Sequence, residues 1–93
     1  MTHETTVTRY PGTLAELADA IGDLRYDALQ EFLECVAEKL REDADKDGGR
    51  KRHRLESCLR NTADRLDEAA AEIKDAWRIA EPFMRDATKQ VNA

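Results

Sequence analysis

The chain has 93 residues, of which 38% are charged and 5% are aromatic, and its net charge is −5. This length fits one domain, and two prolines and four glycines are too few for a β-fold built from many turns. The acidic balance disfavours nucleic acid or an anionic membrane as a partner, and the chain lacks the run of about 18 apolar residues that spans a bilayer.

The N-terminal segment, residues 1–12, is polar and ends in Pro11-Gly12, which predicts a flexible arm that closes in a turn. Thr13 and Glu16 have the spacing of a capping box, in which each side chain accepts a hydrogen bond from the other's backbone N–H. Apolar residues then recur at helical spacing as far as Ile21, and Gly22 fits the position just past a helix C-terminus. We therefore expect a short helix after Thr13.

A second helix is predicted after Asp23, which is a candidate N-cap. Its apolar residues follow at steps of three and four, which gives one amphipathic face. This stripe consists of Tyr26, Leu29, Leu33, Val36 and Leu40, widened by Phe32 and Ala37. The pattern stops at Asp43, and Asp47-Gly48-Gly49 is the strongest helix breaker in the chain, so we expect the turn there.

The third predicted helix is the longest, because its apolar positions keep a heptad register over more than three heptads. The register comprises Leu55, Leu59, Thr62, Leu66, Ala69, Ile73, Ala76 and Ala80, and Ala70 and Trp77 add a second stripe. Pro82 should stop or kink this helix, although the register continues to Phe83 and Ala87. We expect a single helical domain over 13–87 and a frayed tail over 88–93.

The short turn predicts an all-α antiparallel helical hairpin of the two long helices, in which both stripes face each other. Folding the chain about 47–48 pairs Leu40 with Leu55, Leu33 with Thr62, and Leu29 with Leu66. The short first helix should then cover the open end of the hairpin, near Ile73 and Trp77.

Self-association is expected because a hairpin and one short helix cannot cover all the apolar side chains. Dimerisation into a four-helix-type bundle would cover them. The predicted interface consists of Phe32, Trp77, Ile79, Phe83 and Met84. In the alternative, the arm and the C-terminal turns cover this patch within a monomer.

The predicted turn also carries Asp43, Asp45 and Asp47 followed by Gly48, which matches the first half of a calcium loop. The second half fails, because Arg54 stands where a bidentate glutamate is needed. We therefore predict no metal centre, and these three aspartates are the candidate ligands of an alternative, cation-responsive hairpin.

A basic run, Arg50-Lys51-Arg52-His53-Arg54, follows the turn and is a candidate nucleic-acid site. We favour instead its pairing with the acidic residues before the turn, since the rest of the chain is acidic and offers no aromatic platform for bases. Two acidic columns at i, i+4 spacing indicate either solvated faces or a basic partner. They are Glu34, Glu38 and Glu42, and Asp64, Glu68 and Glu72.

The cysteines, Cys35 and Cys58, are too few for a disulfide scaffold, and the N-terminus lacks the apolar core of a secretory signal. We therefore expect a cytoplasmic location and reduced thiols. The sequence offers no nucleophile–base pair, phosphate loop or cofactor motif. The predicted function is a non-enzymatic helical interaction module, an adaptor, regulatory or structural subunit that needs no cofactor. Its partner is a second copy or another protein, and nucleic-acid binding through Arg50, Lys51, Arg52 and Arg54 is the alternative.

Overall fold

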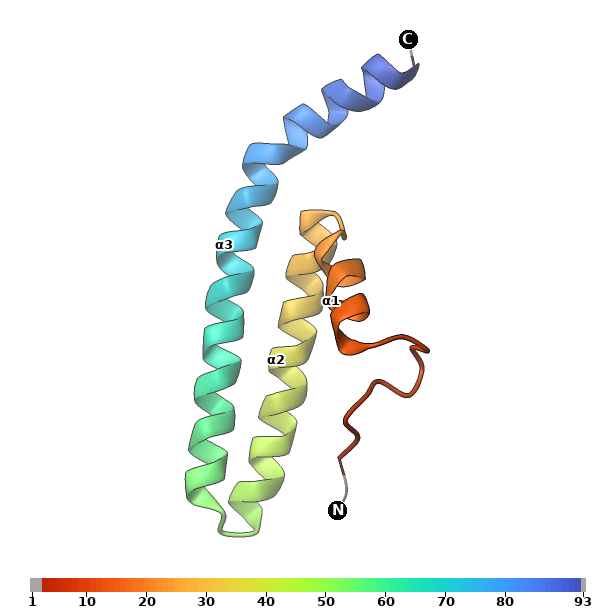
Figure 1. Ribbon diagram of the computed structural model, residues 1–93. Helices are drawn as coiled ribbons and strands as arrows, with labels where there is room; N and C mark the ends of the chain where they lie inside the picture. The colour runs from red at the N-terminus through yellow and green to blue at the C-terminus, as the bar shows by residue number, and fades with distance from the viewer. Residues whose placement is uncertain (1–2, 93) are drawn as a thin grey trace.

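The structure is a computed structural model that describes residues 3–92, with side chains over 3–84. Three helices, α1 (Leu14–Gly22), α2 (Tyr26–Gly49) and α3 (His53–Asn92), make up its regular structure, and the described residues include no strand. Helices α2 and α3 lie antiparallel and side by side (Figure 1), which confirms the predicted all-α hairpin. None of the helices within these ranges has both the length and the apolar character that a membrane span requires.

Helix α1 begins with the predicted capping box. The Thr13 backbone N–H donates to Glu16 Oε1 at 3.0 Å, and the Glu16 N–H donates to Thr13 Oγ1 at 3.1 Å. The other end differs from the prediction, because Gly22 is the last helical residue and its φ is not positive. The N–H of the C-cap residue, Asp23, bonds back to the Asp19 carbonyl at 3.0 Å, so no left-handed residue is needed to close the helix.

The N-cap of α2 is Arg25, so the predicted cap at Asp23 is wrong. The carboxylate inside the first turn explains this difference. Asp27 accepts a hydrogen bond from the Ala28 N–H at 2.9 Å and pairs with the Arg25 guanidinium at 2.7 Å. An acid in the first turn favours a helix start there through the helix dipole.

The turn of the hairpin also lies later than predicted. Helix α2 continues through Gly48 and Gly49, and the chain reverses over 50–52, where Lys51 has a φ of 62°. Gly48 serves a different purpose from a turn residue, because a Cβ there would lie 2.7 Å from the carboxyl group of Glu56 on α3. Gly48 therefore leaves room for the Glu56 side chain inside the hairpin instead of bending the chain.

This later turn changes the register of the hairpin. Reflection about Lys51, instead of 47–48, places Leu40 level with Thr62 and Leu29 level with Ile73. Each residue of α2 thus faces a residue of α3 one heptad beyond the predicted partner. Because the shift is a whole heptad, the same faces of the two helices still meet. The hairpin was therefore predicted correctly although the position of its turn was not.

Fully buried side chains along the hairpin are alanines, so the two backbones pack closely. They are Ala37 and Ala44 on α2, and Ala63 and Ala70 on α3. On α3 the inward positions alternate by three and four, and half of them match the prediction. The seam of α3 comprises Glu56, Leu59, Ala63, Leu66, Ala70, Ile73, Trp77 and Ala80. The other four predicted positions are each one residue too early. They are Leu55, Thr62, Ala69 and Ala76, and the residue that follows each of them lies at the seam.

Helix α3 is longer than α2, 40 residues against 24, so its C-terminal part extends beyond the hairpin (Figure 1). Pro82 lies inside this helix, which bends near it without ending, as the prediction of a kink allowed. A proline ring clashes with the carbonyl four residues earlier and removes one helical hydrogen bond, which accounts for the bend. Helix α3 runs to Asn92, and the side chains of the predicted frayed tail, 88–93, lie outside the described residues.

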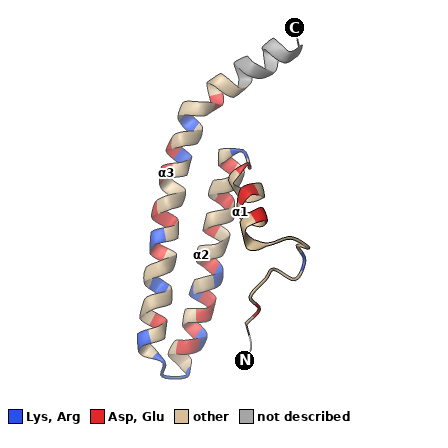
Figure 2. Ribbon diagram, in the orientation of Figure 1, with Lys and Arg blue, Asp and Glu red and all other residues tan. Residues whose placement is uncertain are grey.

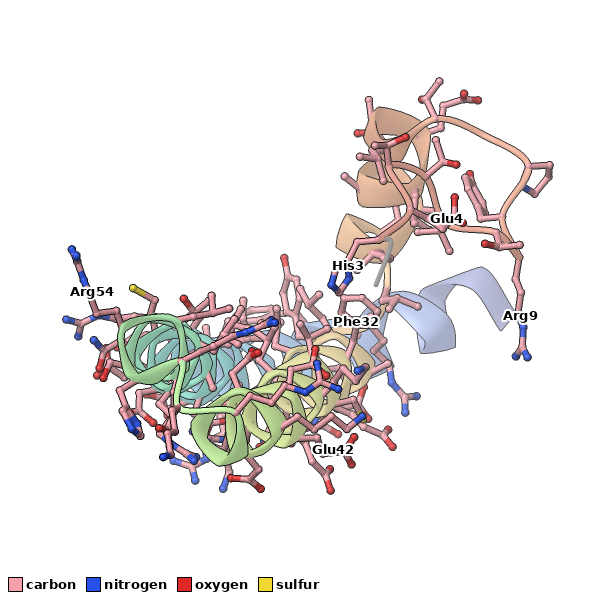
Figure 3. The ribbon with its side chains drawn as sticks, turned by 90° about the horizontal axis from the view of Figure 1, so that it is seen from below. His3, Glu4, Arg9, Phe32, Glu42 and Arg54 are labelled. Atoms are coloured by element: carbon pink, nitrogen blue, oxygen red, sulfur yellow. The ribbon has the colours of Figure 1, made fainter. Side chains whose placement is uncertain are left out.

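Helix α1 has no fully buried residue, and it stands apart from the hairpin in the view along the long helices (Figure 3). The prediction that this short helix covers the open end of the hairpin is wrong. The connection that follows α1 reaches that end, where the Arg25 guanidinium stacks 5.2 Å from the centre of the Trp77 ring. Residues 22–26 also line a shallow recess there with Ala80 and Met84 of α3.

Candidate interaction surface

One side of the hairpin, which we call the apolar flank, carries large apolar side chains that the two helices cover only in part. Near the turn, Leu40 of α2 and Leu55 and Leu59 of α3 line the same recess, so both helices contribute to this side. Helical spacing places the other members of each stripe above them. The apolar flank comprises Leu29, Phe32, Leu33, Val36 and Leu40 on α2, and Leu55, Leu59, Leu66 and Ile73 on α3.

These side chains are half-buried or exposed, and Leu55 keeps 46% of its surface accessible. Phe32 points to the side on which α1 and the arm lie, whereas Glu42 points to the opposite side of α2 (Figure 3). The apolar flank therefore faces α1, but α1 covers it incompletely, since Leu14 remains 56% exposed and neither Leu17 nor Ile21 is fully buried.

The opposite side, the charged flank, is closed by ion pairs between α2 and α3. Arg41 lies 2.9 Å from Asp64 and 2.6 Å from Asp67, and Arg60 lies 2.8 Å from Asp45. Each pair joins the two helices, so together they fix the register that the later turn creates. Pairs as exposed as these contribute little stability each, and their main effect is to orient the helices.

Glu56 belongs to the charged flank and lies within hydrogen-bond distance of three side-chain nitrogens. Its carboxylate accepts hydrogen bonds from Arg60 Nε at 3.0 Å and Nη2 at 2.7 Å, and His53 Nδ1 lies 3.4 Å away. The guanidinium of Arg60, followed by the imidazole of His53, lowers the pKa of Glu56 below its usual 4.5. Sequence reasoning missed this flank because Arg41 and Arg60 each stand alone among acidic residues and meet them only across the hairpin.

Helices α2 and α3 are the only pair among the described elements that packs extensively, so the hairpin is one helix layer thick. Stable domains pack two layers around a core, and a single layer leaves one apolar face open. The accessible area is 7485 Å², whereas a compact monomer of 10.6 kDa exposes about 5,500 Å². The arm, the end of α3 and the apolar flank share this surplus.

The five predicted interface residues do not form one patch. Phe32 lies on the apolar flank, Trp77 stacks beneath Arg25, and Met84 lines the recess at the open end. Ile79 and Phe83 are 69% and 70% exposed. They lie about 200° and 240° around α3 from Trp77 by helix geometry, which places them on its outward face.

The basic run, residues 50–54, forms the tip of the hairpin and is exposed (Figure 2). The predicted pairing with the preceding acids occurs once, between Arg52 and Asp47 at 3.6 Å. Within the described residues, the side chains of Arg50, Lys51 and Arg54 form no ion pair. The tip therefore presents positive charge to solvent, next to the apolar floor of the recess.

The three candidate metal ligands do not converge. Because their segment is helical, residues two apart point in directions about 200° apart. Asp43 pairs with Lys39 at 2.6 Å, while Asp45 pairs with Arg60 on the charged flank and Asp47 with Arg52. Over the part of the chain that the structure describes, no three metal-ligating side chains gather.

The remaining candidates are surface groups. Cys35 and Cys58 are free and exposed. The acidic columns are largely exposed, and Asp64 is the member that pairs across the hairpin, with Arg41. Comparison with known proteins adds nothing to this geometry, because no family model, curated protein or solved structure matches the chain.

Proposed function

We propose that this chain is a helical interaction module that acts through protein–protein contacts made by its apolar flank. The observation that supports this proposal is a hairpin one helix layer thick whose leucine-rich side is only partly covered. A contiguous exposed apolar patch on a small domain marks a contact surface, because burying it outside a partner would require a second layer that the chain lacks.

The simplest partner is a second copy, which would complete a four-helix-type bundle. If each copy buried about 1,000 Å² of its surplus area, the interface would reach about 2,000 Å², the range of stable homodimers. The proposal assigns no reaction to the chain. His53 is exposed and hydrogen-bonds to Glu56, and no hydroxyl or thiol among the described side chains bonds to it.

Sedimentation velocity over a concentration series from about 1 to about 100 μM tests the proposal. We expect a dimer whose population falls on dilution. In the variant Phe32→Gln/Leu55→Gln, the dimer should weaken, because both side chains lie on the apolar flank and are exposed enough for the hairpin to tolerate the change.

The matched control is Ile79→Gln/Phe83→Gln, which removes two apolar side chains of greater exposure from the outward face of α3. It should leave the dimer unchanged. A chain that is monomeric throughout the series would contradict the proposal, and a dimer that only the control variant weakens would assign the contact to the end of α3 instead.

A second candidate function, polyanion binding, is favoured by one observation, the unpaired cations at the tip. A gel shift with a single-stranded oligonucleotide that weakens with salt, and is lost in Arg50→Ala/Arg52→Ala/Arg54→Ala, would support it. The absence of a shift at low salt would exclude it.

A further inference from the structure

Runs of like charge lie at the two ends of the molecule. At one end, the tip contains four cations and no acid over 50–54. At the other end, α1, its connection to α2 and the first turn of α2 carry four acids against one base, namely Glu16, Asp19, Asp23 and Asp27 against Arg25. Figure 2 shows basic residues at the turn, and acidic residues on α1 and on the last turns of α2.

We propose that the apolar flank is occupied by a second copy of this chain arranged head to tail, so that each basic tip lies against the acidic α1 end of its partner. This inference rests on the proposed function and adds the orientation of the two copies. A two-fold axis perpendicular to the helices presents the same flank from both copies and brings opposite charges together at both ends.

The parallel arrangement is disfavoured by charge. It would bring two tips, each with four cations, within about one Debye length of each other at physiological ionic strength. It would also place the two acidic ends side by side. Like charges that meet across an interface oppose association, so the same apolar flank favours the head-to-tail pair.

The shape of the flank fits this arrangement as well. Its recess near the turn has a volume of about 610 Å³. The lining combines three leucines with three cations and two acids, namely Leu40, Leu55, Leu59, Lys46, Arg50, Arg52, Asp43 and Asp47. No residue of α1 lines this recess, and His3 is the residue of the N-terminal arm that does. In a head-to-tail pair, the partner's α1 end, with its exposed Leu14 and its acids, reaches the recess.

The orientation can be measured directly with a spin label at Gly49, next to the tip. A Cβ at Gly49 meets nothing within 4 Å, so Gly49→Cys in a Cys35→Ser/Cys58→Ser background should leave the fold and the charge pattern unchanged. Gly49 lies near the end of α2, so two labels in a head-to-tail pair should be separated by about 35 Å. In a parallel pair they would lie within about 20 Å, which would overturn the proposal.

Charge reversal gives a second, independent readout. The variant Arg50→Glu/Arg52→Glu/Arg54→Glu should raise the dimer Kd about tenfold at low salt, and less at high salt because of screening. This loss cannot come from unfolding of α3, since acids at a helix N-terminus are favourable. Adding Asp19→Lys/Asp23→Lys to the same chain should restore the dimer, because both ends then carry the reversed charge.

The outcomes separate the inference from the function on which it rests. A chain that never dimerises contradicts the proposed function. A stable dimer with short label distances, or one that the reversed tip leaves unchanged, contradicts only the orientation. If the reversed tip abolishes oligonucleotide binding while the dimer is unaffected, the tip serves a polyanion and the head-to-tail contact is wrong.

Discussion

Lys51 closes α2 in the left-handed region, at a φ of 62°, while the two glycines just before it are helical. A left-handed conformation costs an L-residue about 1–2 kcal/mol, and glycine avoids this cost. Glycine also has more conformational entropy in the unfolded chain, which offsets part of this gain. We therefore expect Lys51→Gly to stabilise the hairpin by a net of about 0.5–1 kcal/mol. Urea unfolding followed by circular dichroism measures this gain.

Lys51→Ala is the control for this prediction. It removes the same charge but keeps the Cβ, so it should give no comparable gain. Equal stabilisation by both variants would mean that relief of charge repulsion at the tip, and not backbone strain, is responsible.

The second prediction at the residue scale concerns Glu56 and pH. Because Arg60 and His53 lower the pKa of Glu56 in the folded chain, this carboxylate stabilises the fold at pH values above its usual 4.5. This stabilising contribution of Glu56 is lost as the pH falls through the lowered pKa, because the carboxylate is then protonated in the folded chain as well. The melting temperature of the wild type should therefore fall more steeply below pH 4.5 than that of Glu56→Gln.

Melting curves at constant ionic strength, from about pH 7 to about pH 3, provide this comparison. At neutral pH, Glu56→Gln should be the less stable protein, and the difference should narrow in acid. Parallel curves for the two proteins would show that the Glu56 contacts do not couple folding to protonation.

At the scale of the helices, the close approach of α2 and α3 depends on small residues at the seam. Ala70 is 2% exposed, whereas its neighbour Ala71 is exposed. Extra methylene groups in a packed seam force the backbones apart, so Ala70→Leu should destabilise the hairpin by about 1–3 kcal/mol. Ala71→Leu should be nearly neutral, and unfolding of both variants in urea tests the pair; equal effects would place the seam elsewhere.

The sequence predicted the hairpin because the apolar spacing in each helix is regular, but it placed the seam of α3 one residue off in every second position. The periodicity reports the centre of the apolar stripe, which includes Leu55. The line between two helices instead follows the smallest residues, such as Ala63, because they allow the closest approach. The centre of the apolar stripe and the line of closest approach therefore point in different directions around α3. This difference leaves the leucines on one flank of the hairpin.

The turn was misplaced for a related reason. Gly48 and Gly49 break helices by propensity, but the tertiary contact of Gly48 with Glu56 overrides that preference. Ion pairs such as Arg41–Asp64 then fix the register, and neither partner predicts the other from sequence spacing. The predicted interface was chosen without this register, although the register decides which exposed apolar residues share a face with Phe32.

For the whole molecule, the decisive property is that its single helix layer has one apolar side. Folding and association should then be linked, because a partner that binds only the folded chain raises its apparent stability by mass action. For a dimer of this size, we expect the melting temperature to rise by about 3–5 °C for each tenfold increase in protein concentration.

Differential scanning calorimetry over a hundredfold concentration range measures this dependence. The Phe32→Gln/Leu55→Gln variant should melt lower and depend less on concentration, while Ile79→Gln/Phe83→Gln should follow the wild type, because its changes lie outside the apolar flank. A melting temperature that does not change with concentration would mean that α1 and the two long helices suffice for stability. The open flank would then be a site for a different protein instead of a second copy.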